Sequence, residues 1–403
     1  MEKDKLRKRI LQKKVIIWGL GNQGKNFIKG YSEYFEKVYC TSNNTQERID
    51  YFERIEKKDI FCNFEDYYIV ICSNAYDEIC LELISQGLKP VKNFAPVKVV
   101  EAILNRRKIV MSVGQCELEI INYIYGSMKC LSDKYISIHY DEYKVLGIQE
   151  LSPKLEVIMT VRALMPLADY FIYPINLTKE RNNYYLDILS LKNKNCRCLS
   201  LPLTTFEGYW PQDNVNDYYE ICKYYRKDST GIYPFGNRRD RNIECSLENG
   251  EGKEILKRIL RDDFYSQEKV ENYINKTIRK YELYERKSDL KISDYIRANY
   301  KKKRLFKDRG HAEVFVFKEY ARRILMSFEI EFNEEELEKV DLGWYDKCHN
   351  EFPIYPSVLK YLDFEDNKNY HFFRRNEEIY LDFQSYIEKI YNYLECAKKL
   401  EEI

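Results

Sequence analysis

The chain has 403 residues, of which 44% are apolar and 15% aromatic, so it can bury a large core, and its length favours two or three domains. Lysine and arginine (66) nearly balance aspartate and glutamate (65), which excludes the basic surface of a dedicated nucleic-acid binder. No apolar run approaches the roughly 20 residues of a membrane span, and the charged start is unlike a secretory signal, so we expect a cytoplasmic protein.

Residues 1–104 are predicted to form a Rossmann-like domain with a parallel sheet. A charged helix precedes a buried strand at residues 14–18, and a G-x-G-x-x-G turn formed by Gly19, Gly21 and Gly24 leads into a helix that ends near residue 34. Further strands are expected at residues 37–40 and 67–72. In this context the glycine pattern is typical of a turn that presents backbone N-H groups to a pyrophosphate.

The sequence leaves the ligand of this glycine turn open. The acidic residue that would bind ribose hydroxyls is missing after the second strand, where Asn43 and Asn44 stand instead, so ordinary NAD binding fits poorly. Two interpretations remain: the three glycines contact a nucleotide or sugar nucleotide, or they form a tight turn with a structural role only.

A second α/β domain is predicted for residues 105–330, after the basic stretch 105–108. Its strands are expected at residues 108–113, about 134–139, 157–161, 170–173 and 197–201. Between about residues 250 and 303 the pattern changes to long charged helices, which indicates a helical insertion. Residues 331–403 are expected to pack on this domain as an extension that ends in an amphipathic helix at residues 382–401. The fold class is therefore α/β.

Cys116 lies where the first strand of the second domain turns into a helix. The strand ends at Gly114, and the apolar residues that follow Glu117 read as a mostly buried helix. Cys116 would then begin that helix, where unpaired N-H groups and the positive end of the helix dipole favour a thiolate. The same groups would stabilise the oxyanion of a tetrahedral intermediate. The alternative is that Cys116 is a small core residue.

The twelve cysteines show no Cys-x-x-Cys pair, and no His, Cys and Asp cluster has the spacing of metal ligands. We therefore expect reduced cysteines and no metal.

Asp308 and His311 supply the other half of a possible catalytic set. Cys116 would act as the nucleophile, His311 would accept and return its proton, and Asp308 would fix the imidazole tautomer. His139, His349 and His371 have no such motif and are expected to be structural or exposed. This hypothesis requires the fold to bring the sulfur and the imidazole together.

Four segments resemble the WcbI-type polysaccharide biosynthesis acetyltransferases, and together they span about residues 105–330. They are Gly114-Gln115-Cys116-Glu117, residues 168–175, residues 206–211 with Tyr209 and Trp210, and Gly310-His311. The chain departs from the family pattern at two places: Glu117 replaces a neutral amide, and Ala312 replaces a proline. A carboxylate beside Cys116 opposes thiolate formation, so either Glu117 points away from the sulfur or the chemistry is altered.

The resemblance implies transfer of an acetyl group from acetyl-CoA to a sugar hydroxyl of a capsule or exopolysaccharide. Gly114, Gln115 and Glu117 would then line the site, and Tyr209 and Trp210 would form its sugar-binding wall. Lys303 and Arg304, or the arginines Arg238, Arg239 and Arg241, would bind the CoA phosphates. Two other functions stay open: a deacylase with the same residues, and a non-catalytic protein that binds a sugar nucleotide.

Overall fold

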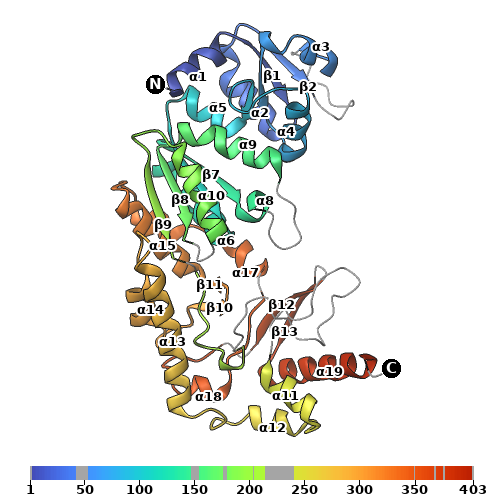
Figure 1. Cartoon of the computed structure of the whole chain (residues 1–403), viewed down its shortest axis with the longest axis vertical. Helices are drawn as coiled ribbons and strands as arrows, with labels where there is room; N and C mark the ends of the chain where they lie inside the picture. Colours follow the sequence, from blue (N-terminus) through green and yellow to red (C-terminus); the bar gives the residue numbers. More distant parts are fainter. Residues whose placement is uncertain are drawn as a thin grey trace. The chain divides into compact units, whose positions relative to one another are not determined.

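The computed structural model (Figure 1) describes residues 2–41, 53–146, 154–175, 179–202, 204–213, 240–348, 350–366, 369–374 and 377–401. The chain divides into two compact units. The first comprises Met1–Ser200 with Ile324–Val340, and the second comprises Leu201–Arg323 with Asp341–Ile403. The predicted boundary near residue 104 falls inside the first unit, where it separates two sheets. The division into three domains stays a prediction.

The first sheet of the first unit is parallel and has the order β3-β2-β1-β4-β5. This order matches the first five strands of a doubly wound sheet, in which the strands are arranged 3-2-1-4-5-6. The predicted α/β class is therefore confirmed. Its strands are β1 Lys14–Trp18, β2 Val38–Thr41, β3 Glu53–Arg54, β4 Tyr67–Ile71 and β5 Phe94–Pro96. Its helices are α1 Glu2–Leu11, α2 Asn22–Tyr31, α3 Lys57–Cys62, α4 Tyr76–Ser85 and α5 Val97–Leu104, with short 3-10 turns at Ser32–Tyr34 and Phe64–Asp66.

The glycine turn after β1 is sterically tight. Gly19 has a φ of 106°, and a Cβ there would lie 2.7 Å from the carbonyl oxygen of Cys72. A Cβ on Gly24 would lie only 2.1 Å from the carbonyl oxygen of Gly19, whereas Gly21 has no atom within 4 Å of that position. Packing therefore explains two of the three glycines. Binding of a nucleotide here stays a prediction, and Asn43 and Asn44 lie outside the described residues.

The second sheet of the first unit has the order β7-β6-β8-β9. Cys116 lies just after the carboxyl end of its inner strand β6. Its strands are β6 Lys108–Gly114, β7 Tyr135–Asp141, β8 Tyr170–Pro174 and β9 Arg197–Leu201, and β6 is parallel to both β7 and β8. The helices around it are α6 Cys116–Ser127, α7 Lys129–Ser132, α8 Glu142–Leu146, α9 Leu155–Leu164, α10 Lys179–Ser190 and α16 Glu334–Lys339. A 3-10 turn, Met165–Leu167, follows α9.

The predicted strand at residues 157–161 is wrong, because these residues belong to helix α9. The β-branched Val157 and Val161 favoured a strand. In the structure Val157, Thr160, Val161 and Leu164 are buried, and this spacing of three and four residues places them on one face of a helix. Packing of that face on the core overrides the local preference for a strand.

One apolar core joins the two sheets of the first unit. Ile17 of β1, Ala102 of α5, Met111 of β6 and Phe171 of β8 belong to the same buried cluster. Asp169 adds a polar tie, because its carboxylate accepts a hydrogen bond from the backbone N-H of Ile109 at 2.7 Å and also contacts the ammonium group of Lys3. The segment 168–175 therefore has a structural role in holding β6 to β8.

The second unit is mostly helical, as predicted for residues 250–303. Its helices are α11 Arg241–Asn249, α12 Glu254–Ile259, α13 Gln267–Glu285, α14 Ser293–Asn299, α17 Gly343–Cys348, α18 Pro356–Leu359 and α19 Phe383–Glu401, with a 3-10 turn at Pro211–Asp213. Helix α15, Val314–Ser327, contributes to both units. Two antiparallel hairpins complete it: β10 Phe306–Asp308 with β11 His311–Ala312, and β12 Tyr370–Arg374 with β13 Glu377–Leu381.

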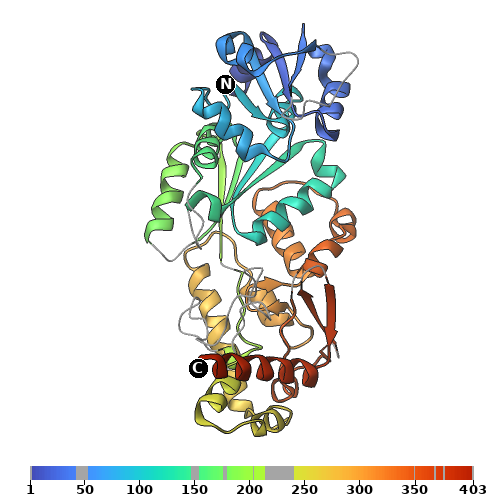
Figure 2. The same ribbon diagram turned by 90° about the vertical axis from the view of Figure 1, so that its right-hand side faces the viewer.

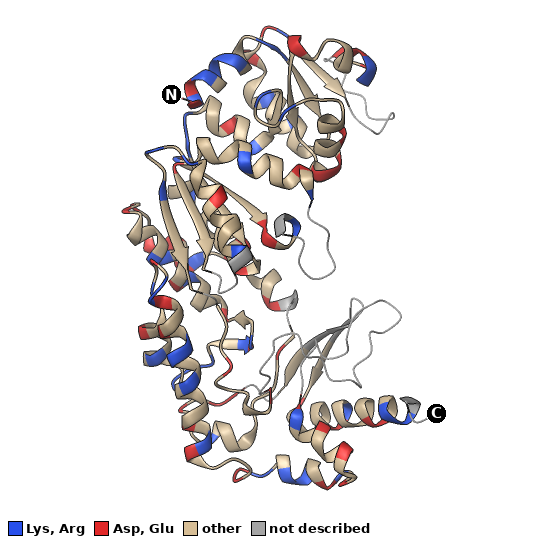
Figure 3. Ribbon diagram, viewed as in Figure 1, with Lys and Arg blue, Asp and Glu red and all other residues tan. Residues whose placement is uncertain are grey.

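The predicted last helix is confirmed as α19, whereas the β12–β13 hairpin that lies beside it (Figure 2) was not predicted. Acidic and basic residues are interspersed along the helices of both units (Figure 3), which agrees with the balanced composition. Within the described ranges, no helix combines the length and the apolar character needed to cross a membrane.

The glycine turn yields a test of packing. Gly24→Ala is expected to destabilise the first unit by about 1–3 kcal/mol, because the added methyl group overlaps the Gly19 carbonyl. Gly30→Ala in the same helix is the control: its Cβ meets no atom within 4 Å, so it should be neutral or stabilising. Urea unfolding followed by Trp18 fluorescence measures both. Equal stability of the two variants would contradict the steric argument.

Candidate functional site

Cys116 is the first residue of helix α6, as predicted from the sequence. Gln115 is the N-cap, with an extended backbone (φ −91°, ψ −166°) and a carbonyl that accepts from the N-H groups of Leu118 and Glu119. The cysteine is half-buried. Since α6 has 12 residues, the positive end of its dipole lies at this sulfur.

Gly114 is required by the close approach of α6 and β8. A Cβ at this position would lie 2.4 Å from Cδ1 of Leu118 and 3.3 Å from Cδ of Pro174. A larger residue would require the buried side chain of Leu118 or the helix α6 to shift. Packing thus explains the glycine at position 114, and its predicted place in the lining of a ligand site stays a prediction.

The sheet order places Cys116 at a favourable point for binding. Strand β6 is followed by α6 and β7 on one side, whereas its other neighbour, β8, is followed by α10 and β9 on the opposite side. The carboxyl ends of β6 and β8 therefore form a topological switch point, which is where ligands bind in open α/β sheets.

Glu142 and its partners extend the site, and sequence analysis missed them. The register pairs Gly114 with Asp141, so Glu142 follows β7 at the same edge as Cys116. Its side chain is fully buried and accepts a hydrogen bond from Nε2 of Gln115 at 3.3 Å. Nη1 of Arg181 lies 3.8 Å from its other oxygen. Burial raises the pKa of Glu142, and Arg181 offsets part of that shift. Sequence analysis could have identified Glu142 from its position, because it directly follows a strand that is parallel to β6.

Glu117 faces Cys116. Its Oε2 lies 3.9 Å from the Cys116 sulfur, and only 8% of the residue is exposed. Of the two alternatives left open by the sequence, the orientation away from the sulfur is therefore excluded. A carboxylate at this distance accepts a hydrogen bond from the thiol, and its negative charge opposes formation of the thiolate.

Asp308 and His311 form a hydrogen-bonded pair in the second unit. Oδ2 of Asp308 lies 2.8 Å from Nδ1 of His311, while Oδ1 accepts from the backbone N-H groups of Gly310 (2.7 Å) and His311 (3.0 Å). Asp308 is buried, and the His311 side chain is 29% exposed. A carboxylate that accepts from Nδ1-H leaves the lone pair on Nε2, which is the tautomer a general base requires.

The segment 206–211 and the turn after it contact the hairpin that carries this pair. The N-H of Phe206 donates to the carbonyl of Arg309 at 2.9 Å, and the ring of Phe206 stacks on Phe306 of β10 at 5.3 Å. Nη1 of Arg309 lies 3.7 Å from a carboxylate oxygen of Asp213 in the following turn. The family segment therefore sets the position of the loop between Asp308 and His311.

Tyr209 and Trp210 are placed in the core, which corrects the prediction of a sugar-binding wall. Both are fully buried. The hydroxyl of Tyr209 donates to the carbonyl of Tyr300 at 2.8 Å, and Nε1 of Trp210 donates to the carbonyl of Phe352 at 3.0 Å. Side chains with no accessible surface and with satisfied polar groups support the fold and do not contact a sugar in this conformation.

The predicted phosphate-binding cations differ in their availability. The guanidinium group of Arg304 is buried, binds Asp366 at 2.8 Å and donates to three backbone carbonyls, so it is a structural residue. The ammonium group of Lys303 donates to the Tyr295 hydroxyl at 3.2 Å, lies 4.0 Å from the centre of the Phe315 ring and is only partly buried. Arg238 and Arg239 lie outside the described residues.

Cys116 belongs to the first unit and the Asp308–His311 pair to the second. The structure shows the local geometry of each, and the approach of the sulfur to the imidazole stays a prediction.

Comparisons with known proteins find similarity to one family over part of the chain. Residues 184–333 match the family model of the polysaccharide biosynthesis enzyme WcbI, a range that includes Asp308 and His311 but not Cys116. A solved structure is also similar, with 18% identity and a TM-score of 0.53 over 72% of this chain and 90% of that chain. It is described as native WcbI without a disulfide bond between coenzyme A and a cysteine. No curated protein matches. The predicted resemblance to the WcbI family is confirmed.

The contact between Glu117 and Cys116 predicts that Glu117→Gln increases thiol reactivity. Removing the negative charge favours the thiolate, so Cys116 should react several-fold faster with iodoacetamide near neutral pH. Peptide mass spectrometry measures the rate. The exposed Cys62, Cys245 and Cys396 serve as internal controls and should not change. A rate for Cys116 that is unchanged or slower in the variant would contradict the proposed effect of the carboxylate.

The burial of His139 predicts that the first unit loses stability at acidic pH. Its Nδ1 lies 3.0 Å from the hydroxyl oxygen of Ser112, and burial lowers its pKa from 6.5 to about 4. Between these values the unfolded chain binds a proton that the folded chain does not. Stability is therefore complete above about pH 6.5 and falls by roughly 3 kcal/mol as the pH drops toward 4.

The measurement uses Trp18 as the reporter of the first unit, in a background with Trp210→Phe and Trp344→Phe. His139→Asn, which keeps a polar partner for Ser112, should flatten the pH dependence of urea unfolding. The histidine has no such role if the slope is the same in both proteins.

Proposed function

We propose that the protein is an O-acyltransferase that uses acyl-CoA to modify a sugar hydroxyl of a surface polysaccharide. The observation that carries this proposal is the Asp308–His311 pair, whose 2.8 Å hydrogen bond leaves Nε2 of the imidazole as a proton acceptor. The nucleophile in this proposal is Cys116, at a helix N-terminus on the carboxyl edge of a parallel sheet.

The reaction would proceed in two steps. In the first, His311 accepts the thiol proton of Cys116, the sulfur attacks the acyl carbonyl carbon, and the thioester C-S bond of acyl-CoA breaks. The proton returns to the leaving thiolate. In the second step His311 accepts the proton of the sugar hydroxyl, its oxygen attacks the acyl-cysteine, and the Cys116 sulfur leaves and recovers the proton. The N-H groups at the start of α6 would stabilise both oxyanions.

The family match supports polysaccharide biosynthesis as the process, because residues 184–333 match a polysaccharide biosynthesis enzyme. Coenzyme A and a cysteine are named together in the description of the similar WcbI structure, which supports CoA as the acyl carrier here. Of Lys303 and Arg304, only Lys303 keeps an ammonium group that is partly exposed and could contact a phosphate. Arg304 is not proposed for this role.

A second candidate function is deacylation. The observation in its favour is the Glu117 carboxylate 3.9 Å from the Cys116 sulfur. A carboxylate beside an acyl-cysteine can accept a proton from water, which would direct the acyl group to hydrolysis.

Exposure to acetyl-CoA is expected to add one acetyl group to Cys116. Intact and peptide mass spectrometry detect the adduct. Cys116→Ser should abolish the labile thioester, and His311→Ala should slow its formation by about 100-fold or more, since general base catalysis contributes at least that factor. Asp308→Asn, which keeps the size of the side chain but not its charge, should also slow it.

The fate of the adduct separates the candidate functions. An adduct that persists in buffer and decays only with an added sugar acceptor supports transfer, whereas rapid decay in buffer alone supports deacylation. Absence of the adduct together with unchanged thermal stability at saturating CoA would contradict both, and would leave a non-catalytic role. Binding of CoA at 100 times its dissociation constant should otherwise stabilise the protein by about 2.7 kcal/mol.

A further inference from the structure

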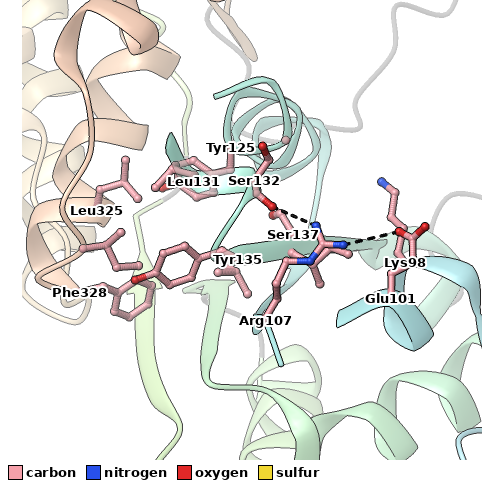
Figure 4. Close-up of a pocket in the computed structure, with 14 residues that line it drawn as sticks. Lys98, Glu101, Arg107, Tyr125, Leu131, Ser132, Tyr135, Ser137, Leu325 and Phe328 are labelled. Carbon is pink, nitrogen blue, oxygen red and sulfur yellow. Dashed lines mark hydrogen bonds and ion pairs between the residues drawn. The ribbon is translucent and has the colours of Figure 1, made fainter. Parts of the chain in front are cut away.

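The first unit contains a cavity of about 190 Å³ that the proposed reaction does not use (Figure 4). It lies at the opposite end of the sheet from Cys116. The strand β6 begins beside the cavity and ends at Gly114, and Tyr125 and Gly126, at the far end of α6, line it. The 12 residues of α6 separate the two places by roughly 18 Å.

One side of the cavity is apolar. Figure 4 shows Leu131, Leu325 and Phe328 on this side, with the ring of Tyr135 extending toward the middle. The wall is held by ring packing, because Tyr170 lies 4.8 Å from Phe328 and 6.0 Å from Tyr135, measured between ring centres. This side therefore suits a flat apolar group.

The other side is charged and carries an excess of one positive charge. Lys98, Glu101 and Arg107 line it (Figure 4). Nη1 of Arg107 donates to the carbonyl of Ser132 at 3.0 Å, whereas Nη2 lies 3.9 Å from the Glu101 carboxylate, which is too far for a hydrogen bond. Burial raises the pKa of Glu101, which weakens this carboxylate as a partner for the cations.

Lys98 is exposed and makes no hydrogen bond or ion pair with the residues that the structure describes. Two cations face one carboxylate here, and neither Lys98 nor Nη2 of Arg107 has a closely bound anion. The charged side therefore favours an anionic group over a cationic or neutral one.

The volume limits the size of the ligand. A protein cavity of about 150 Å³ accommodates a benzene ring, and sites for larger organic ligands measure about 300–1,000 Å³. A cavity of about 190 Å³ therefore has room for one ring or a short branched chain with a single carboxylate.

We propose that this cavity binds a small monocarboxylate, with its apolar body between Tyr135, Leu325 and Phe328 and its carboxylate between Lys98 and Arg107. The site is distinct from the proposed acyl-transfer site.

Benzoate is the probe, and isothermal titration with the full chain is the measurement. Benzoate is expected to bind saturably with a stoichiometry of one. Benzamide has the same shape without the charge and should bind at least about tenfold more weakly, because it loses the charge-assisted hydrogen bonds. Cys116→Ser should leave the affinity for benzoate unchanged, so failure of the acyltransferase proposal would not affect this result.

Two variants, with Gly126→Ala as a matched control, locate the bound benzoate. Gly126→Leu should abolish binding, because a Cβ at Gly126 meets no atom within 4 Å and the longer side chain would fill the cavity. Gly126→Ala adds only a methyl group and should retain most of the affinity. Lys98→Met, a change at an exposed position, should weaken binding by about threefold, as expected for a partly exposed charge.

Three results would overturn the proposal: no saturable binding of benzoate, equal affinities for benzoate and benzamide, or benzoate affinity unchanged in both Gly126→Leu and Lys98→Met. The Lys98 variant keeps the test decisive if the larger substitution at Gly126 unfolds the protein, which its thermal unfolding profile would show.

Discussion

The parallel pairing of β6 with β7 and β8 is the constraint on which the candidate site depends. Because the strands run in the same direction, their carboxyl ends meet at one edge, and Gly114, Glu142 and Pro174 lie there together. A shift of register by one residue would turn every side chain of β6 to the other face. The tight contact of Gly114 with Leu118 then fixes where α6 starts, and hence where the Cys116 sulfur lies.

The second half of the site depends on aromatic packing. The short β10–β11 hairpin could not hold an imidazole in one orientation alone, since a two-stranded hairpin is only marginally stable. Phe206 stacks on its first strand and binds the Arg309 backbone, while the hydroxyl of Tyr209 accepts from the N-H of Leu305. Residues that the family pattern places in a site thus act from the core, through the backbone that carries Asp308 and His311.

Much of the fold was predictable because its signals are local. Each strand of the parallel sheets that reads as a short apolar run next to a glycine or a charged stop was found, including 14–18, 108–113 and 197–201. Residues 157–161 were misread because β-branched residues occur on helix faces when the core requires it. The hairpin β12–β13 was missed because its two strands mix aromatic and charged residues without a clear pattern, and their pairing depends on tertiary contacts.

The site was predictable only in part, because some of its contacts are local in the sequence and others depend on the fold. Asp308 and His311 are three residues apart, so their contact follows from local geometry, and the start of α6 follows from the glycine before it. The partners of Gln115 could not be found in this way, because Glu142 and Arg181 reach the same edge through strand order. Burial of Tyr209 and Trp210 also depends on distant segments, which is why a motif alone suggested an exposed wall.

Two charges of opposite sign act on the Cys116 thiol: the positive end of the α6 dipole and the Glu117 carboxylate. A helix N-terminus stabilises an anion by about 0.3–2 kcal/mol. A carboxylate at the 3.9 Å observed for Glu117 opposes a thiolate by about 4 kcal/mol in a partly exposed environment. The carboxylate and the helix dipole therefore act on the Cys116 thiol in opposite directions. In the proposed acylation of Cys116, a base that accepts the thiol proton during the reaction, the role proposed for His311, would overcome the opposition of this carboxylate.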